Sequence, residues 1–131
     1  MNRISIIVIF IGTSIIEILG GWDMWLQALV FASAIDYISG IIGAGYRGEL
    51  SSKIGFQGIA KKVAMFTVVA IACRVSQVLG TDFIRHATIT YYMANEFLSV
   101  LENTTEMGVP IPSFLGKLLK KMKDDNDKGG E

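Results

Sequence analysis

Residues 24–46 read MWLQALVFASAIDYISGIIGAGY, and this run decides the fold because Asp36 is its single charged residue. An α-helix rises about 1.5 Å per residue, so about 20 residues cross a hydrocarbon core of about 30 Å. The run is long enough for such a crossing, and a single charged residue is compatible with a membrane span. We therefore expect residues 24–46 to form a transmembrane helix.

Three further apolar runs of similar length accompany this one, at residues 4–22, 63–80 and 83–101. The first begins like a signal peptide, but no small-residue cleavage pattern follows its apolar stretch, so we expect it to be retained. Charged residues make up only 18% of the chain, against about 25% in soluble domains. The runs predict an all-α integral membrane bundle of about four transmembrane helices. The last run carries the most polar residues, among them Arg85, His86, Asn95 and Glu96.

The basic residues outside these runs predict the orientation, because segments rich in Lys and Arg stay in the cytoplasm. The connection 47–62 and the tail beyond residue 112 are basic, whereas the turns at 20–23 and 80–82 contain no basic residue. Four spans place both termini and the basic connection in the cytoplasm. Three spans would put either the start or the tail of the chain on the wrong side, unless the first run lies on the membrane surface. The residues expected to set topology and contact the membrane surface are Arg47, Lys53, Lys61, Lys62, Lys117, Lys120, Lys121 and Lys123.

The chain changes character after Pro110 and Pro112. Residues 113–123 place apolar side chains on one helical face and lysines on the other, which is typical of a helix on an anionic membrane surface. Residues 124–131 contain no apolar side chain, and we expect them to be disordered. The sequence thus predicts a transmembrane helical domain at 1–112 and a cytoplasmic part at 113–131. That part serves either to assist insertion or to regulate the protein.

Charged residues within the runs need a reason, since each costs several kcal/mol in a bilayer unless it is paired or hydrated. Glu17 and Arg74 lie at similar depths, about 8 to 9 Å from the outer ends of their runs, which favours an interhelical ion pair. Asp36 and Glu96 fall near the middle of the second and fourth runs. We expect these four residues to lie inside the bundle.

Small and polar residues recur at helical spacing in the second, third and fourth runs, and such faces allow close approach and hydrogen bonding between helices. Three interpretations are open for these faces. They are packing faces of a monomeric bundle, the lining of an oligomeric water-filled lesion, or a carboxylate relay for protons or ions. The residues expected to control packing or a pore are Glu17, Asp36, Gly40, Gly43, Arg74, Gln77, Asn95, Glu96 and Ser99.

Composition excludes several other classes of function. The formal net charge of +0 argues against a nucleic-acid-binding protein, which needs a basic surplus. Cys73 and His86 are the single cysteine and histidine, so no disulfide and no Cys/His zinc site is expected. No nucleophile–base pattern and no phosphate-binding glycine loop is present in the sequence. We therefore expect no catalytic residue, metal or cofactor.

Two segments carry a family resemblance. The first is IDYISG at 35–40, followed by SS at 51–52 and GFQGIAKKVAM at 55–65. The second is NEFLSVLEN at 95–103, followed by GVPIP at 108–112. Together they resemble the toxin-secretion and phage-lysis holin family, in which an acidic span precedes a Ser-rich loop and a Glu-containing last span leads through Gly-x-Pro-x-Pro into a basic tail. The first apolar run matches this family only in hydrophobicity, and Arg74 has no counterpart in its pattern.

The resemblance implies a function without enzymatic chemistry. It implies a multi-pass protein of the bacterial cytoplasmic membrane that forms homo-oligomers and opens lesions, through which a cell-wall hydrolase (an endolysin) or a toxin leaves. The implied partners are the lipid bilayer, further copies of the chain and the released protein, with no nucleic acid. Two alternatives stay open: a small ion channel or transporter subunit that uses Asp36 and Glu96, and a membrane anchor that recruits a cytoplasmic partner.

Overall fold

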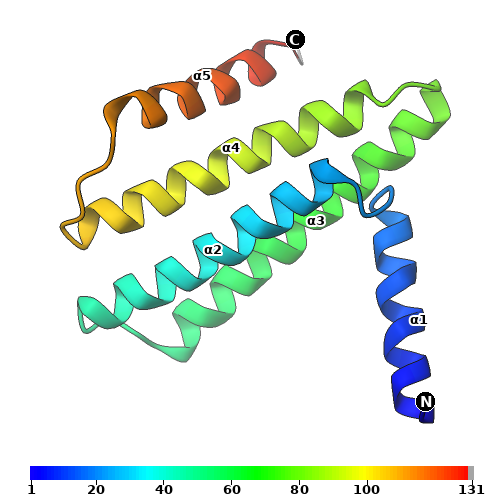
Figure 1. Ribbon diagram of the computed structural model, residues 1–131, viewed down its shortest axis with the longest axis horizontal. Helices are drawn as coiled ribbons and strands as arrows, with labels where there is room; N and C mark the ends of the chain where they lie inside the picture. The colour runs from blue at the N-terminus through cyan, green and yellow to red at the C-terminus, as the bar shows by residue number, and fades with distance from the viewer. Residues whose placement is uncertain (130–131) are drawn as a thin grey trace.

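The computed structural model describes residues 1–129, which form five α-helices and no strand. The helices are α1 (Arg3–Ile18), α2 (Met24–Tyr46), α3 (Ser52–Leu79), α4 (Phe83–Glu106) and α5 (Ser113–Gly129). Helices α2 to α5 lie side by side, each antiparallel to the one before it, whereas α1 leaves the bundle at a steep angle (Figure 1). The expected all-α fold is confirmed.

Local sequence signals set the helix boundaries. The side chains of Asn2, Asp23 and Ser51 accept hydrogen bonds from backbone N–H groups three residues later, at 2.8, 2.9 and 3.2 Å, and so begin α1, α2 and α3. Asn, Asp and Ser are favoured at this position because they satisfy N–H groups that have no partner within the helix. Helix α3 ends at Leu79, because the next residue, Gly80, has a left-handed φ of 69°, which suits glycine.

Helix α4 occupies the centre of the bundle, with α2, α3 and α5 packed around it. The apolar core lies where α2, α3 and α4 meet near the α1 end, and its fully buried side chains are Leu26, Leu29, Val69 and Ile89. Truncating such a side chain to alanine typically costs about 2–5 kcal/mol. This core fixes the relative height of the three helices and thereby positions the polar residues beyond it.

The outward faces of α2 and α3 are apolar and exposed in the isolated chain. They include Phe31, Ile38 and Ile42 on α2, and Ile59, Val63 and Ile71 on α3. A soluble monomer rarely exposes contiguous apolar surface on this scale. Within residues 1–129, α2 and α3 are the two helices that are long and apolar enough, by length and composition, to cross a membrane.

The first apolar run is shorter as a helix than expected. Helix α1 contains 16 residues and is therefore about 24 Å long, short of the roughly 30 Å of a hydrocarbon core. It ends because Gly20 and Gly21 adopt φ values of 98° and 104°, which turn the chain toward α2. None of its residues is buried.

Two other expected boundaries were wrong. The connection predicted at 47–62 is short, because the Ser51 cap starts α3 well before residue 63 and makes residues 52–62 helical. Helix α5 continues past residue 123 to Gly129, where lysines and aspartates four residues apart favour helix. Helical backbone thus replaces the disorder expected at 124–129, and residues 130 and 131 lie outside the described part of the chain.

Candidate functional site: an ion cluster at the middle of the bundle

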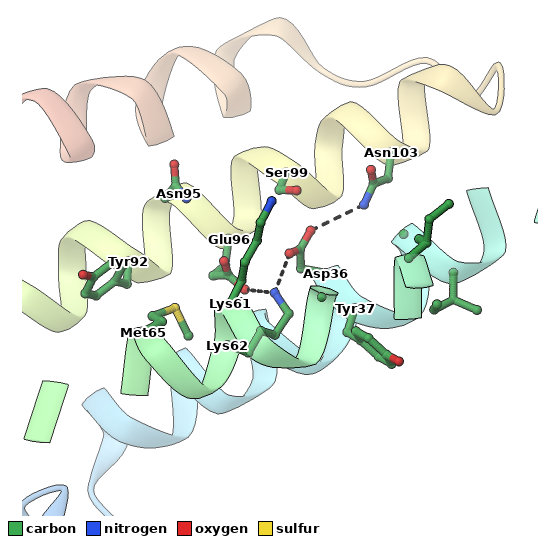
Figure 2. Close-up of a pocket in the computed structure, with 14 residues that line it drawn as sticks. Asp36, Tyr37, Lys61, Lys62, Met65, Tyr92, Asn95, Glu96, Ser99 and Asn103 are labelled. Carbon is green, nitrogen blue, oxygen red and sulfur yellow. Dashed lines mark hydrogen bonds and ion pairs between the residues drawn. The ribbon is translucent and has the colours of Figure 1, made fainter. Parts of the chain in front are cut away.

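Three charged side chains from three helices meet between α2, α3 and α4. Lys62 Nζ lies 2.6 Å from Asp36 Oδ2 and 2.5 Å from Glu96 Oε2, and Figure 2 shows the ammonium group between the two carboxylates. The side chains of Lys62, Asp36 and Glu96 are only 17%, 14% and 10% exposed. One positive and two negative charges are therefore held together in a poorly hydrated part of the bundle.

The three residues lie at one height for a simple geometric reason. Asp36 is ten residues before the last residue of α2, Lys62 is ten residues after the first residue of α3, and Glu96 is ten residues before the last residue of α4. Because adjacent helices are antiparallel, these three helix ends lie at the same end of the bundle (Figure 1). At 1.5 Å per residue the cluster is about 15 Å from that end, which is half of a hydrocarbon core.

Neutral polar groups complete the cluster on the side of the basic connection. Asn103 Nδ2 donates to Ser39 Oγ at 2.9 Å and to Asp36 Oδ1 at 3.4 Å. Ser39 Oγ in turn donates to the backbone carbonyl of Asp36 at 3.1 Å. Asp36 is thus held by side chains from both neighbouring helices.

Glycines in α3 make room for Tyr37 beside the cluster. The Tyr37 hydroxyl donates to the carbonyl oxygen of Gly55 at 3.3 Å. A Cβ atom at Gly58 would lie 3.1 Å from Tyr37 Cε2, closer than ordinary van der Waals contact. Gly58 therefore allows the tyrosine ring to pack directly on the α3 backbone.

A cavity of about 470 Å³ opens beside these groups. Its lining comes from α2, α3 and α4 and includes the three charged residues together with Gly40, Asn95 and Ser99. An ion pair removed from water gains little net stability, but loss of one partner leaves an uncompensated charge, which is costly. The arrangement can therefore hold three helices together when closed, and the open cavity gives water a route to the same charges.

A second charged contact lies at the opposite end of the bundle. Arg85 is buried, and its Nη1 and Nη2 atoms lie 2.6 and 3.1 Å from the two carboxylate oxygens of Asp23. Its Nε atom also donates to the carbonyl oxygen of Leu19 at 2.9 Å. The hydrogen bond from Arg85 lowers the pKa of Asp23 below its ordinary value. This contact fastens the turn between α1 and α2 to the start of α4.

Close packing at this turn requires glycine. A Cβ atom at Gly20 would collide with Nε of Arg85 and with the Cys73 sulfur. Trp25 and His86 stack nearby, with ring centroids 4.2 Å apart. His86 thus has a packing role at the start of α4.

The structure brings together only some of the predicted packing residues. Asp36 and Glu96 meet through Lys62, while Gly43 is buried within α2. The predicted ion pair between Glu17 and Arg74 is absent: both side chains are exposed, and Arg74 Nη1 donates to Gln77 Oε1 at 3.0 Å. The prediction failed because α1 lies away from the bundle and α3 turns Arg74 outward.

The basic residues predicted to lie at the membrane surface differ in their environments. Lys53, Lys61, Lys117 and Lys121 are exposed. Arg47 forms exposed ion pairs with Glu49 and Glu106, at 3.0 and 2.8 Å. The assignment of Lys62 to the surface was wrong, because the early start of α3 turns this residue inward.

Helix α5 packs against α4, with Leu119 buried at the contact. The apolar side chains predicted to share one face of residues 113–123 do not share one environment, since Phe114 and Leu118 are 70% and 52% exposed. Lys123 Nζ donates to Asn95 Oδ1 at 3.1 Å, and Lys120 borders a neighbouring cavity. The basic tail helix thus covers part of α4 in this structure.

Sequence reasoning missed the roles of Arg85, Asp23 and Asn103. A usable signal existed for the first pair: Arg85 is the single Arg or Lys in the fourth run, and Asp23 lies at the corresponding end of the antiparallel second run. For Asn103 the signal was weaker, because the predicted span ended before it. The helix continues to Glu106, and this extra length brings Asn103 to Asp36.

Comparison with known proteins gives a consistent result over most of the chain. Residues 13–124 match the bacteriophage holin family. A protein of Listeria monocytogenes described as uncharacterized is 45% identical over 114 residues, which cover 83% of this chain and 81% of the relative. A probable holin of Bacillus phage phi105 is 32% identical over 108 residues, which cover 82% of this chain and 80% of the phage protein. No solved structure matches the chain.

Proposed function

The chain belongs to the bacteriophage holin family, whose members act without enzymatic chemistry, and on this premise we propose that it opens lesions in the bacterial cytoplasmic membrane. Copies accumulate in the membrane, associate through their helices, and form openings that pass a cell-wall hydrolase. A secreted toxin is the alternative protein that such openings would release. The relative from phage phi105 is named a probable holin, which supports this proposal.

The observation that carries the proposal is the position of the Lys62–Asp36–Glu96 cluster. It ties α2, α3 and α4 together at about half the depth of a bilayer, while the outer faces of α2 and α3 are apolar. Charges at that depth are tolerated only when paired or hydrated. In the closed bundle they are paired with one another, and in a lesion water replaces that pairing.

We assign the end that carries Arg47 and Lys53 to the cytoplasm, because basic connections stay on that side. Helices α2, α3 and α4 then cross the membrane in turn, and the tail begins in the cytoplasm. Helix α1 makes the fourth crossing when the uncharged residues 19–22 extend its apolar length. Both termini then lie in the cytoplasm.

An ion relay is less well supported by the geometry. A relay across a membrane needs ionisable groups at successive depths, but Asp36 and Glu96 share one depth and one lysine. We keep ion conduction and membrane anchoring as alternative outcomes of the same experiment.

The test is induced expression in a bacterial host, with and without a cytoplasmic cell-wall hydrolase, while membrane potential and optical density are followed. We expect abrupt depolarisation in both strains and lysis only where the hydrolase is present. Depolarisation with the hydrolase retained in the cell would indicate an ion-conducting pore. An intact potential at high membrane levels of the protein would contradict the proposal and favour an anchor.

A further inference from the structure

The face of α4 that α5 covers contains polar side chains in the middle of the helix. Asn95 accepts a hydrogen bond from Lys123 at 3.1 Å, and the same ammonium group lies 5.8 Å from the centre of the Tyr91 ring. Ser99 and Glu102 line a cavity of about 410 Å³ between the two helices. In Figure 2 Asn95 points from α4 toward α5, at the edge of the cavity that also borders the Lys62 cluster.

This contact is incompatible with a membrane-spanning α4. Asn95 is 11 residues before the end of α4 at Glu106, which corresponds to a depth of about 16 Å. Docked α5 would carry Lys123 to that depth, together with Lys120 and Asp124 close by. Each such charge costs at least about 2.5–3.5 kcal/mol at the centre of a bilayer. Helix α5 must therefore leave α4 when α4 enters the hydrocarbon.

Departure of α5 leaves Asn95 without its partner. The other sides of α4 are already occupied by α2 and α3. Asn103 is hydrogen-bonded to α2, and Glu96 forms an ion pair with α3. An amide in hydrocarbon without a hydrogen-bond partner is costly, and α4 therefore needs a polar partner on this face. Lipid chains cannot supply one.

We propose that a second copy of this chain binds this face of α4, through Asn95 and Ser99, once α5 has moved away. The inference rests on the proposed function and names the contact through which copies associate. In a two-fold pair each Asn95 amide donates to and accepts from its counterpart, and the small Ser99 side chain allows the helices to approach closely. Docked α5 and a second copy compete for one surface, so the tail helix delays association until insertion removes it.

The test is disulfide cross-linking of the full-length chain in isolated membranes, with Cys73→Ser as background. Ser99→Cys is nearly isosteric, and Ile59→Cys on the exposed side of α3 is the matched control. Each residue lies seven positions from its helix end on the side of the basic connection, which gives the two cysteines the same depth of about 10 Å. We expect several-fold more dimer from Ser99→Cys on oxidation.

Equal dimer yields at the two positions would overturn the inference. A second variant, Ser99→Cys with Lys120→Cys, tests whether α5 stays docked, because both residues line the same cavity. A bismaleimide should then join two chains, and a product linked mainly within one chain would also overturn the inference. Membrane potential separates this result from the proposed function. Depolarisation without Ser99 dimers contradicts only the interface, whereas dimers with an intact potential contradict only the lesion.

Discussion

Lys62 of α3 bridges to Asp36 of α2, with Nζ 2.6 Å from Oδ2, at a height where each residue is ten positions from the same end of the bundle. Glu96 joins them from α4. Removing the lysine therefore leaves two carboxylates facing each other without a cation. Removing one carboxylate leaves a Lys–carboxylate ion pair with no net charge. The two kinds of substitution should have different consequences.

Substitution of Lys62 by Met should lower the free energy of unfolding by about 3–5 kcal/mol, because it leaves buried charge uncompensated. The measurement is thermal or denaturant unfolding of the purified protein in detergent. Lys61→Met is the matched control, since its side chain is exposed and its loss should change stability by no more than about 0.5 kcal/mol. Equal stability of the two variants would show that the cluster does not hold the helices together.

Neutralising one carboxylate should shorten the delay before lesions open. Asp36→Asn and Glu96→Gln each remove one ionic contact between helices while a Lys–carboxylate pair remains. We expect earlier depolarisation than in the wild type at equal protein levels, measured with a potential-sensitive dye. Glu49→Gln removes an exposed ion pair with Arg47 and should leave the onset unchanged. An unchanged onset in both cluster variants would contradict this role.

Gly20→Ala should destabilise the protein more than Gly21→Ala. Both glycines have positive φ, so the backbone strain is similar, but only at Gly20 would the new Cβ meet Arg85 and Cys73. Overpacking of this kind costs about 1–3 kcal/mol, which should appear as the difference between the two variants in thermal unfolding. Equal melting temperatures would mean that Arg85 and Cys73 can move away from the new Cβ atom without loss of stability.

The Asp23–Arg85 contact predicts a specific acid sensitivity. Because the hydrogen bond from Arg85 lowers the pKa of Asp23 in the folded chain, ionised Asp23 contributes stability above its ordinary pKa of 3.8. That contribution is lost as pH falls below 3.8 toward the folded-state pKa. Melting temperatures between about pH 6 and pH 3 should fall less in Asp23→Asn than in the wild type. Parallel curves for the two proteins would contradict the prediction.

The path of α1 can be decided by cysteine labelling in protoplasts, again with Cys73→Ser as background. If α1 crosses the membrane, Asn2→Cys should be protected from an impermeant maleimide, as should Lys53→Cys in the cytoplasmic end of α3. Thr81→Cys, in the turn between α3 and α4, should be labelled from outside. Labelling of Asn2→Cys to the extent of Thr81→Cys would instead leave three spans, with α1 on the outer surface.

The sequence was sufficient to predict the helices and their order, because the apolar length of a run is a local property. It placed Asp36 and Glu96 at the same height, since each lies near the middle of its run. It did not place Lys62 between them. The start of α3 was set too late by hydrophobicity alone, and the Ser51 cap turns Lys62 toward the other helices.

The failed pairing of Glu17 with Arg74 has a different cause. Equal depth is a property of each run, but contact also requires the helices to be neighbours and the side chains to face each other. Gly20 and Gly21 direct α1 away from α3, and the buried side of α3 carries Val69, Cys73 and Ser76 instead of Arg74. Neither condition can be read from the spacing of charges.

The ten-residue distance from Ser52 to Lys62 also makes the chain unequally tolerant of changes in length. A residue added to the turn between α2 and α3 would lengthen a surface connection and leave the cluster in place. A residue added between Ser52 and Lys62 would rotate the lysine by about 100° around the α3 axis, away from both carboxylates. Only an insertion of about a full turn, with a rise of about 5 Å, would face it inward again, at a different level.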